Sequence, residues 1–482
     1  MVEERACASR AGPVHLTPIP MDAEPSPLHL AGDRPAPRTG AIGHSRSVIW
    51  SLAWPVIITM LSESLVGLVD MLFVARLGAP AVAAVGTGAQ ILGGVSVTMT
   101  AVGTGTLALV ARAIGAARLA EAERVLGQSI VIAAVLSALV ILPVIVFASE
   151  LVAAFGVEPH VVELGAGFVR LVMLSIPASA VIFVVASGLR GAGDTRTPLV
   201  VGLTVNALNV LGNWVFIFGK FGMPALGVRG SGLATALAFT AGMALALFLL
   251  ASGRLRLRIG WRDLALHGAT IRRVLSIGYP AAAEQLLMQF GFFLYLLFAA
   301  RYGTDAVAAY FIGVRILALS FLPGFGFAAA AAALVGQNLG AGQPKRAQTA
   351  GWHATWMSVA LMSTTGIVIS IFAEDIAHFF VDTPAVVAGT VSFIHMLAIS
   401  QPLMAMDFTI GGALRGAGDT RFPLLTVLIA FYGCRLGMSF VVVSVLHLSL
   451  AWLWAALIGD YVARASLKAW RFRRGDWQAI SV

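Results

Sequence analysis

Four acidic residues lie inside long apolar stretches of the chain, where a charge is expensive. They are Glu63, Asp70, Glu284 and Asp407, from a total of 23 Asp and Glu. A carboxylate at membrane depth costs about 2.5–3.5 kcal/mol on insertion scales, so such a group normally binds a cation, takes up a proton or faces a cavity. The alternative is a neutral, hydrogen-bonded carboxyl that serves packing. The sequence favours a function for Asp70 and Glu284, and it leaves both interpretations open for Glu63 and Asp407.

Polar side chains that could surround Asp70 occur in two later apolar stretches. Asn206, Asn209 and Asn213 lie in one of them, and Thr235 lies in the next. Asn209 and Asn213 are four residues apart, so a helix places them on one face. Carboxylate, amide and hydroxyl oxygens form a plausible ligand set for a hard monovalent cation such as Na⁺. They equally form a hydrogen-bond shell around a carboxyl that binds and releases H⁺.

The amino-acid composition indicates that the elements carrying these polar residues are membrane-spanning helices. The 482 residues are 59% hydrophobic and 11% charged, whereas soluble domains have roughly 45–50% apolar and about 25% charged residues. This excludes a water-soluble fold. The apolar runs last about 20 residues and lack two-residue alternation, which favours helices over a barrel. We therefore predict an all-α polytopic membrane protein with twelve spans, near 50–73, 82–109, 125–148, 162–188, 198–218, 230–251, 274–299, 307–335, 350–373, 386–412, 424–446 and 448–468.

The two halves of the chain are copies of one unit. A shift of 225 residues aligns them without a gap: Pro55 falls on Pro280, and the octapeptide LRGAGDTR at 189–196 recurs at 414–421. Because each half has an even number of spans, six, the chain returns to the same side of the membrane and both copies insert in the same direction. The sequence thus predicts two six-helix lobes related by a pseudo-twofold axis along the membrane normal, with a cleft between them.

This repeat divides the chain into five parts. They are a disordered N-terminal tail (1–45, with Met21 as an alternative start), an N-lobe (46–251), a cytoplasmic linker (252–273), a C-lobe (274–470) and a cytoplasmic C-terminal tail (471–482). Cys7 falls in the tail and Cys434 in an apolar run, so we expect no disulfide framework.

The net charge of +9 follows from the positive-inside rule and does not indicate nucleic acid. Most of the 32 basic residues fall on one side if both termini are cytoplasmic. This count includes the arginines of both octapeptides and the five basic residues from Arg464 to the C-terminus. Only Arg170, Arg315 and Arg435 are expected within spans. We expect a multi-pass protein of the cell inner membrane.

The octapeptide itself has the glycines of a phosphate-binding loop but lacks its Gly-Lys-Ser/Thr ending. We interpret it as a tight cytoplasmic turn, in which Gly ends one helix, Asp caps the next and Pro begins it. No Walker, His-Glu-x-x-His or Gly-x-Ser-x-Gly motif is present. The sequence therefore predicts neither an enzyme nor ATP-driven transport, and no cofactor or bound metal apart from a coupling ion.

Taken together, these features resemble the multidrug and toxic compound extrusion (MATE) transporters, whose superfamily also holds lipid-linked oligosaccharide flippases. The resemblance covers 46 to about 470. It depends on Trp54-Pro55, Leu68-Val-Asp70, Pro280 to Glu284, both octapeptides, and the segments 206–218, 224–227 and 230–235. It implies twelve helices in two lobes and export of organic cations in exchange for H⁺ or Na⁺.

The resemblance also implies roles for individual residues. Asp70 is similar to the N-lobe carboxylate of the family, and Asn209 and Thr235 to its companions. Asn213 departs from the family's pattern, because several prokaryotic relatives have a second Asp at the corresponding position. Glu284 and Asp407 resemble the C-lobe acids of another branch of the family, but each lies about one helical turn from the matching position. Together with Glu63 they are secondary candidates for coupling or substrate binding.

The main hypothesis is a secondary active multidrug exporter whose partners are small organic cations or drugs and the bilayer, and which acts as a monomer without nucleic acid. The coupling site consists of Asp70, Asn209, Asn213 and Thr235. Because the 225-residue shift replaces Asp70 by Tyr295, the polar cluster is expected only in the N-lobe. The alternative is a lipid-linked oligosaccharide flippase. Such a protein would line its cleft with several cationic side chains for pyrophosphate.

Overall fold

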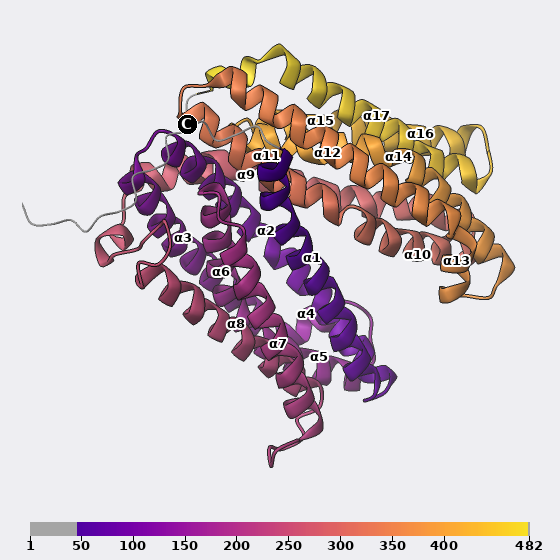
Figure 1. Cartoon of the computed structure of the whole chain (residues 1–482). Coiled ribbons are helices and arrows are strands. Elements are labelled where there is room, and N and C mark those ends of the chain that lie inside the picture. The colour runs from indigo at the N-terminus through magenta and orange to yellow at the C-terminus, as the bar shows by residue number, and fades with distance from the viewer. Residues whose placement is uncertain (1–45, 481–482) are drawn as a thin grey trace, which may run out of the picture. The chain divides into compact units, whose positions relative to one another are not determined.

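A computed structural model of the chain describes residues 46–480, and this part is helical with no β-strand. The predicted disordered tail (1–45) and Cys7 lie outside the described residues. Figure 1 shows α1–α8 grouped together and followed by a second group, α9–α17. We call these the N-lobe and the C-lobe.

The helices of the N-lobe follow the apolar stretches closely. Their bounds are α1 (Arg46–Ala75), α2 (Ala79–Gly115), α3 (Leu119–Val146), α4 (Ala148–Ala153), α5 (Pro159–Met173), α6 (Ser175–Gly191), α7 (Arg196–Phe218) and α8 (Val228–Ala251). A short 3₁₀-helix, η1 (Trp261–Leu264), lies in the linker to the C-lobe.

The C-lobe has more breaks along the chain. Its helices are α9 (Gly268–Ala300), α10 (Thr304–Ser320), α11 (Leu322–Gly340), α12 (Pro344–Ile371), α13 (Ala373–Phe380), α14 (Pro384–Gly416), α15 (Arg421–Thr426), η2 (Val427–Leu436), α16 (Gly437–Phe440), η3 (Val441–Val445), α17 (Leu450–Arg474) and η4 (Asp476–Ala479). The segments α15 to η3 form one continuous span, in which η2 and η3 are π-helical.

The described helices account for the predicted spans. Ten of them are long and apolar enough to cross a membrane when α10–α11 and α15–η3 each count as one. The pair α5–α6, bent by 42°, makes an eleventh. The twelfth predicted span is α17, which is more polar because it carries buried Asp460, Arg464 and Lys468. The all-α polytopic fold is confirmed.

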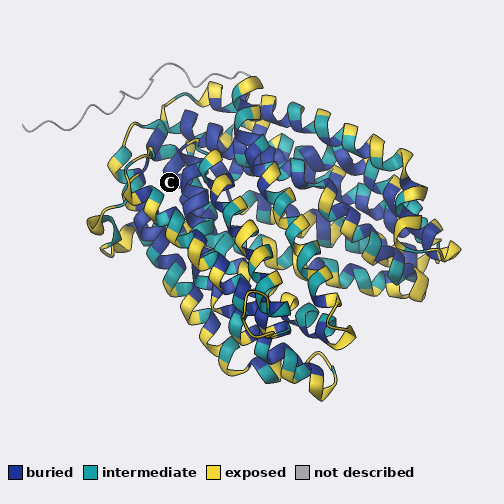
Figure 2. Cartoon of the chain, turned by 60° about the horizontal axis from the view of Figure 1, so that its bottom comes forward, coloured by how far each residue is buried: buried dark blue, intermediate teal, exposed yellow. Residues whose placement is uncertain are grey.

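Large apolar side chains cover much of the outer surface. Leu72, Leu139 and Ile371 are each more than 60% exposed. Figure 2 shows exposed positions along the middle of helices as well as at their ends. A water-soluble protein does not leave so much apolar surface in contact with water. This surface is therefore the lipid-facing surface of a multi-pass membrane protein.

The lobes meet at close helix crossings that obey the predicted twofold symmetry. A Cβ on Gly278 of α9 would overlap the Ala101 carbonyl of α2, and a Cβ on Gly326 of α11 would overlap the Ala53 carbonyl of α1. A shift of 225 residues converts the first pair into the second. The same holds for Gly115 against the Gln337 carbonyl and Gly340 against the Arg112 carbonyl. Contacts between the lobes thus repeat as the internal repeat requires.

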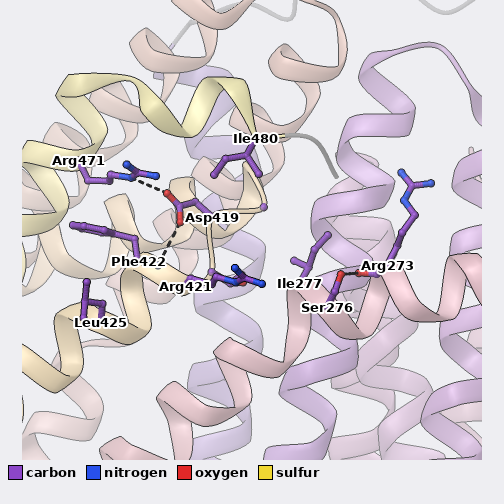
Figure 3. Close-up of a pocket in the computed structure, with 11 residues that line it drawn as sticks. Arg273, Ser276, Ile277, Asp419, Arg421, Phe422, Leu425, Arg471 and Ile480 are labelled. Atoms are coloured by element: carbon purple, nitrogen blue, oxygen red, sulfur yellow. Dashed lines mark hydrogen bonds and ion pairs between the residues drawn. The ribbon is translucent and has the colours of Figure 1, made fainter.

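The two octapeptides form the tight turns predicted from their sequence. Gly193 and Gly418 have φ values of +87° and +88°, a region that favours glycine. Asp194 accepts backbone N–H groups from Arg196 and Thr197 at the start of α7. In the second copy, the Asp419 carboxylate lies between the Phe422 N–H and the Arg471 guanidinium (Figure 3). No phosphate-binding role is needed to explain these glycines.

Candidate functional site

The structure brings the four predicted coupling residues together in the N-lobe. Asn213 of α7 donates to the Asp70 Oδ1 of α1 at 2.6 Å. Asn209 lies one turn earlier, between Asp70 and Thr235 of α8. When its amide nitrogen faces Asp70, it donates to both carboxylate oxygens at 3.0 Å each, and its oxygen accepts from Thr235 Oγ1 at 3.0 Å. This orientation satisfies both neighbours, and we adopt it.

The local helix geometry explains why these side chains meet. Asn209 and Asn213 lie on the face of α7 that is buried against α1 and α8, and both are less than 5% exposed. Asp70 and Thr235 are half-buried. The Asn213 Oδ1 is buried and accepts no hydrogen bond. The site therefore offers one carboxylate and one unused amide oxygen within a polar cluster surrounded by apolar helices.

Two other polar residues that the sequence placed near this site lie apart from it. Asn206 donates to Ser62 Oγ at 3.0 Å and so links α7 to α1. Glu63 is exposed and makes no ion pair within 4.0 Å among the described residues. Although Glu63 and Asp70 lie on the same helix, Glu63 is not a member of the polar cluster.

The C-lobe has a polar network of its own, so the expectation of a cluster only in the N-lobe is wrong. Asp407 of α14 pairs with Lys468 at 2.6 Å and with Arg464 at 3.4 Å, both on α17. Arg464 also pairs with Asp460 at 2.8 Å, and Asp460 with Arg435 of η2 at 2.7 Å. All five side chains are 3% exposed or less.

Besides its ion pair with Asp460, Arg435 is surrounded by aromatic rings. Its guanidinium carbon lies 4.4 Å from the Phe431 ring centroid and between 5.5 and 5.6 Å from those of Phe292, Tyr295 and Tyr461. Cation–π attraction of this kind is worth up to about 2 kcal/mol when the cation is desolvated. The position one residue before Arg435 corresponds to Asn209 in the repeat. The corresponding region of the C-lobe therefore holds a cation where the N-lobe holds amides.

A cavity of about 520 Å³ lies between the lobes. This volume is within the roughly 300–1,000 Å³ of ligand pockets. Glu284 of α9 and Asp407 line the cavity, whereas Asp70 and Glu63 do not. The Glu284 carboxylate pairs with Arg415 of α14 at 3.0 Å. The structure thus separates the N-lobe polar cluster from the C-lobe acids.

Four cationic residues of this cavity were missed by the sequence analysis. Arg190, Arg415, Arg464 and Lys468 line its wall. The sequence assigned Arg190 and Arg415 to cytoplasmic loops and counted Arg464 and Lys468 with the cytoplasmic C-terminus. Helices α6 and α14 extend about one turn beyond the predicted spans and so include Arg190 and Arg415. Helix α17 continues to Arg474, so Arg464 and Lys468 lie well inside it. A usable signal was present, because Asp460, Arg464 and Lys468 recur every four residues and so form one helix face.

Comparison with known proteins places this architecture in a family. The model of the MatE family matches residues 55–215 and 280–441, which is one match in each lobe and about two-thirds of the chain. The chain belongs to the MatE family. As a MatE protein it is a transporter and not an enzyme.

Curated relatives cover nearly the whole MatE chain. A "Probable multidrug resistance protein NorM" of Thermotoga maritima is 28% identical over 439 residues, which is 91% of this chain and 94% of the relative. The "Multidrug resistance protein PmpM" of Pseudomonas aeruginosa is 28% identical over 396 residues, which is 81% of this chain and 82% of the relative.

Solved structures share the fold at lower identity. A MOP superfamily transporter from Pyrococcus furiosus, described as having a binding pocket of reverse polarity, has a TM-score of 0.83 and 23% identity over 90% of this chain and 96% of that one. A structure described as the outward-facing conformation of a multidrug resistance MATE family transporter also has a TM-score of 0.83, with 23% identity over 89% and 96% of the two chains.

Proposed function

We propose that this MatE transporter is a secondary active multidrug exporter driven by inward movement of H⁺ or Na⁺. The observation that carries the proposal is the half-buried Asp70 carboxylate, held by the amides of Asn209 and Asn213 in apolar helices. A carboxylate at this depth normally has a cation to bind or release. The names of the relatives as multidrug resistance proteins support drug export.

Asp70 is the charge-changing element in this proposal. With a cation bound, the site is neutral; without one, it is negative. The unused Asn213 Oδ1 and the Thr235 hydroxyl are additional oxygens that a Na⁺ ion could use. If H⁺ is the coupling ion, the amides instead stabilise the carboxylate after the proton leaves. Either ion makes the charge of the N-lobe depend on the gradient.

The substrate pathway of the proposal runs through the cavity between the lobes. Organic cations or drugs are the expected substrates, and rocking of the lobes exposes the cavity to one side at a time. We further propose that the protein lies in the cell inner membrane with both termini cytoplasmic, and that it works as a monomer without a cofactor.

A lipid-linked oligosaccharide flippase is the second candidate. One specific observation favours it: the cavity is lined by Arg190, Arg415, Arg464 and Lys468. Several cationic side chains in the cleft are what a pyrophosphate headgroup requires. Drug-susceptibility testing of a pump-deficient host that expresses the protein distinguishes the two, because we expect only the exporter to raise tolerance to a broad panel of drugs.

Transport in proteoliposomes tests the exporter. We expect the wild type to accumulate drug when a pH or Na⁺ gradient is imposed, and Asp70→Asn to lose this accumulation because Asn cannot change charge. The control variant is Asp305→Asn, which removes an exposed carboxylate at the start of α10. If Asp70→Asn transports at the wild-type rate under the same gradient and at equal abundance, Asp70 serves packing and the coupling assignment is wrong.

A further inference from the structure

The cavity between the lobes has more positive than negative groups in its wall. Its lining includes four cationic side chains (Arg190, Arg415, Arg464 and Lys468) and only two acidic ones (Glu284 and Asp407). Because a cleft with low-dielectric walls focuses the field of the charges that line it, this imbalance acts on any charged ligand. The cavity thus has the wrong polarity for a simple organic cation.

Both acidic side chains already have cationic partners. Glu284 has both carboxylate oxygens within hydrogen-bond distance of Arg415 Nη1, at 3.2 and 3.0 Å. Asp407 is shared by Lys468 and Arg464. An organic cation could bind either acid only by displacing a cation of the protein, and that cation would then remain in the same wall without a partner.

Arg190 is the cation that has no acidic partner. No carboxylate lies within 4.0 Å of it in the part of the chain that the structure describes. Its Nε is buried and has no hydrogen-bond partner. Glu63 of α1 acts on Arg190 only at longer range. Arg190 is partly buried, and a cation in such a place is costly when no carboxylate lies within ion-pair distance, unless a ligand supplies the opposite charge.

Most of the remaining wall is apolar and aromatic. Both lobes contribute large rings or thioethers, with Phe183 and Met60 from the N-lobe and Phe321, Phe325 and Phe408 from the C-lobe. Such walls bind the apolar body of a ligand, and flexible methionines adapt to different shapes. Arg190 projects from the N-lobe wall, and the other three cations project from the C-lobe wall.

We propose that the cavity binds amphiphiles that have an apolar, preferably aromatic, body and a carboxylate or phosphate group, and that Arg190 is the main contact of this anionic group. The inference rests on the proposed function, since it names the substrate class of that transporter. It replaces the simple organic cation by an anionic or zwitterionic compound. A phosphate of this kind can belong to a free compound or to a lipid headgroup.

Equilibrium binding to the purified full-length protein tests the proposal without any gradient. The probes are two xanthene dyes of similar size: 5-carboxyfluorescein, which is anionic, and tetramethylrhodamine methyl ester, which is cationic. Fluorescence anisotropy measures their dissociation constants. We expect carboxyfluorescein to bind at least about tenfold more tightly. Equal binding of the two dyes, or tighter binding of the rhodamine, overturns the proposal.

Substitutions locate the anionic group. Arg190→Gln is expected to weaken carboxyfluorescein binding about tenfold or more, the loss that one charge-assisted hydrogen bond implies, and Arg190→Lys to restore most of it. The matched control is Arg196→Gln, which removes an exposed arginine of the same octapeptide. If Arg190→Gln and Arg196→Gln bind equally well, Arg190 is not the contact and the proposal fails.

Competition identifies the source of the anion. Displacement of carboxyfluorescein by a polyprenyl diphosphate at lower concentration than by 1-naphthoate assigns a lipid headgroup, and the reverse order assigns a free aromatic anion. Displacement by neither overturns the proposal. Because binding needs no ion gradient, a failure of gradient-driven export in proteoliposomes contradicts the proposed function and leaves the binding result unaffected.

Discussion

Arg190 and Arg415 are the same residue of the repeated octapeptide, 225 residues apart, and both line the cavity between the lobes. Their surroundings differ. Arg415 pairs with Glu284 at 3.0 Å, whereas Arg190 has a buried Nε without a partner. The repeat therefore places two equivalent cations in the two walls of one cavity, and only the C-lobe cation has a carboxylate partner within ion-pair distance. This asymmetry is what gives the cavity its unpaired positive group.

The Arg415–Glu284 pair should behave as a coupled unit. Arg415→Gln leaves the Glu284 carboxylate unpaired in a partly buried wall, which we expect to cost about 1–3 kcal/mol of unfolding free energy. The double variant with Glu284→Gln should recover part of this loss. Reversible unfolding in mixed detergent micelles measures the cycle. Simple additivity of the two single substitutions would mean that the pair makes no coupled contribution.

Asp460 should be among the most sensitive positions of the C-lobe. Its carboxylate is fully buried and accepts both Arg435 and Arg464. Asp460→Asn would leave two guanidinium groups without full compensation, and breaking a buried pair in this way costs about 3–5 kcal/mol. We expect a large loss of folded protein in the membrane, measured by fluorescence-detected size-exclusion chromatography. The exposed Glu150→Gln is the control, and equal yields of the two variants would contradict the prediction.

The fold was largely predictable because its two signals are strong in sequence. Apolar runs of membrane length defined the spans, and an octapeptide repeated at a constant shift defined the lobes. The crossings of Gly278 with Ala101 and Gly326 with Ala53 then follow from the symmetry. The ends of the helices were less predictable. A charged residue near the end of an apolar run looks the same in sequence whether it lies in a loop or faces a cavity.

The candidate site was predictable where a single polar residue interrupts an apolar run. Asp70 and the asparagines of α7 have this pattern, and the structure brings them together. The C-lobe network was not predictable in the same way. Asp460, Arg464 and Lys468 lie in the second half of the last predicted span (448–468), where a position near the cytoplasmic side is the ordinary expectation. Only the packing of α17 against α14 and η2 buries them.

Asn213→Asp should increase the affinity of the N-lobe site for its coupling cation. The Asn213 amide lies 2.6 Å from Asp70 Oδ1, so a carboxylate there would share the site with a second one. Two carboxylates this close cannot both stay charged without a cation between them. We expect export to continue and the half-saturating H⁺ or Na⁺ concentration to fall, measured from initial transport rates. An unchanged ion dependence would show that residue 213 lies outside the coupling site.

Gly105 should control how closely the lobes approach. A Cβ at this position of α2 would overlap the Val274 carbonyl of α9, whereas a Cβ at Gly94 of the same helix meets nothing within 4 Å. Gly105→Ala must therefore push α9 away and is expected to destabilise the closed contact by about 1–3 kcal/mol, the usual effect of overpacking. Gly94→Ala should have little effect or slightly favour the helix.

The separation can be measured at Gln337, which is buried at the neighbouring crossing and donates to the Gly191 carbonyl at 2.7 Å. In a protein whose two native cysteines are replaced by serine, Gln337→Cys reports opening through its rate of labelling by a polar thiol reagent. We expect labelling to be several times faster with Gly105→Ala than with Gly94→Ala, because the crossing opens more often. Equal labelling rates in the two backgrounds would mean that α9 accommodates the methyl group without separating the lobes.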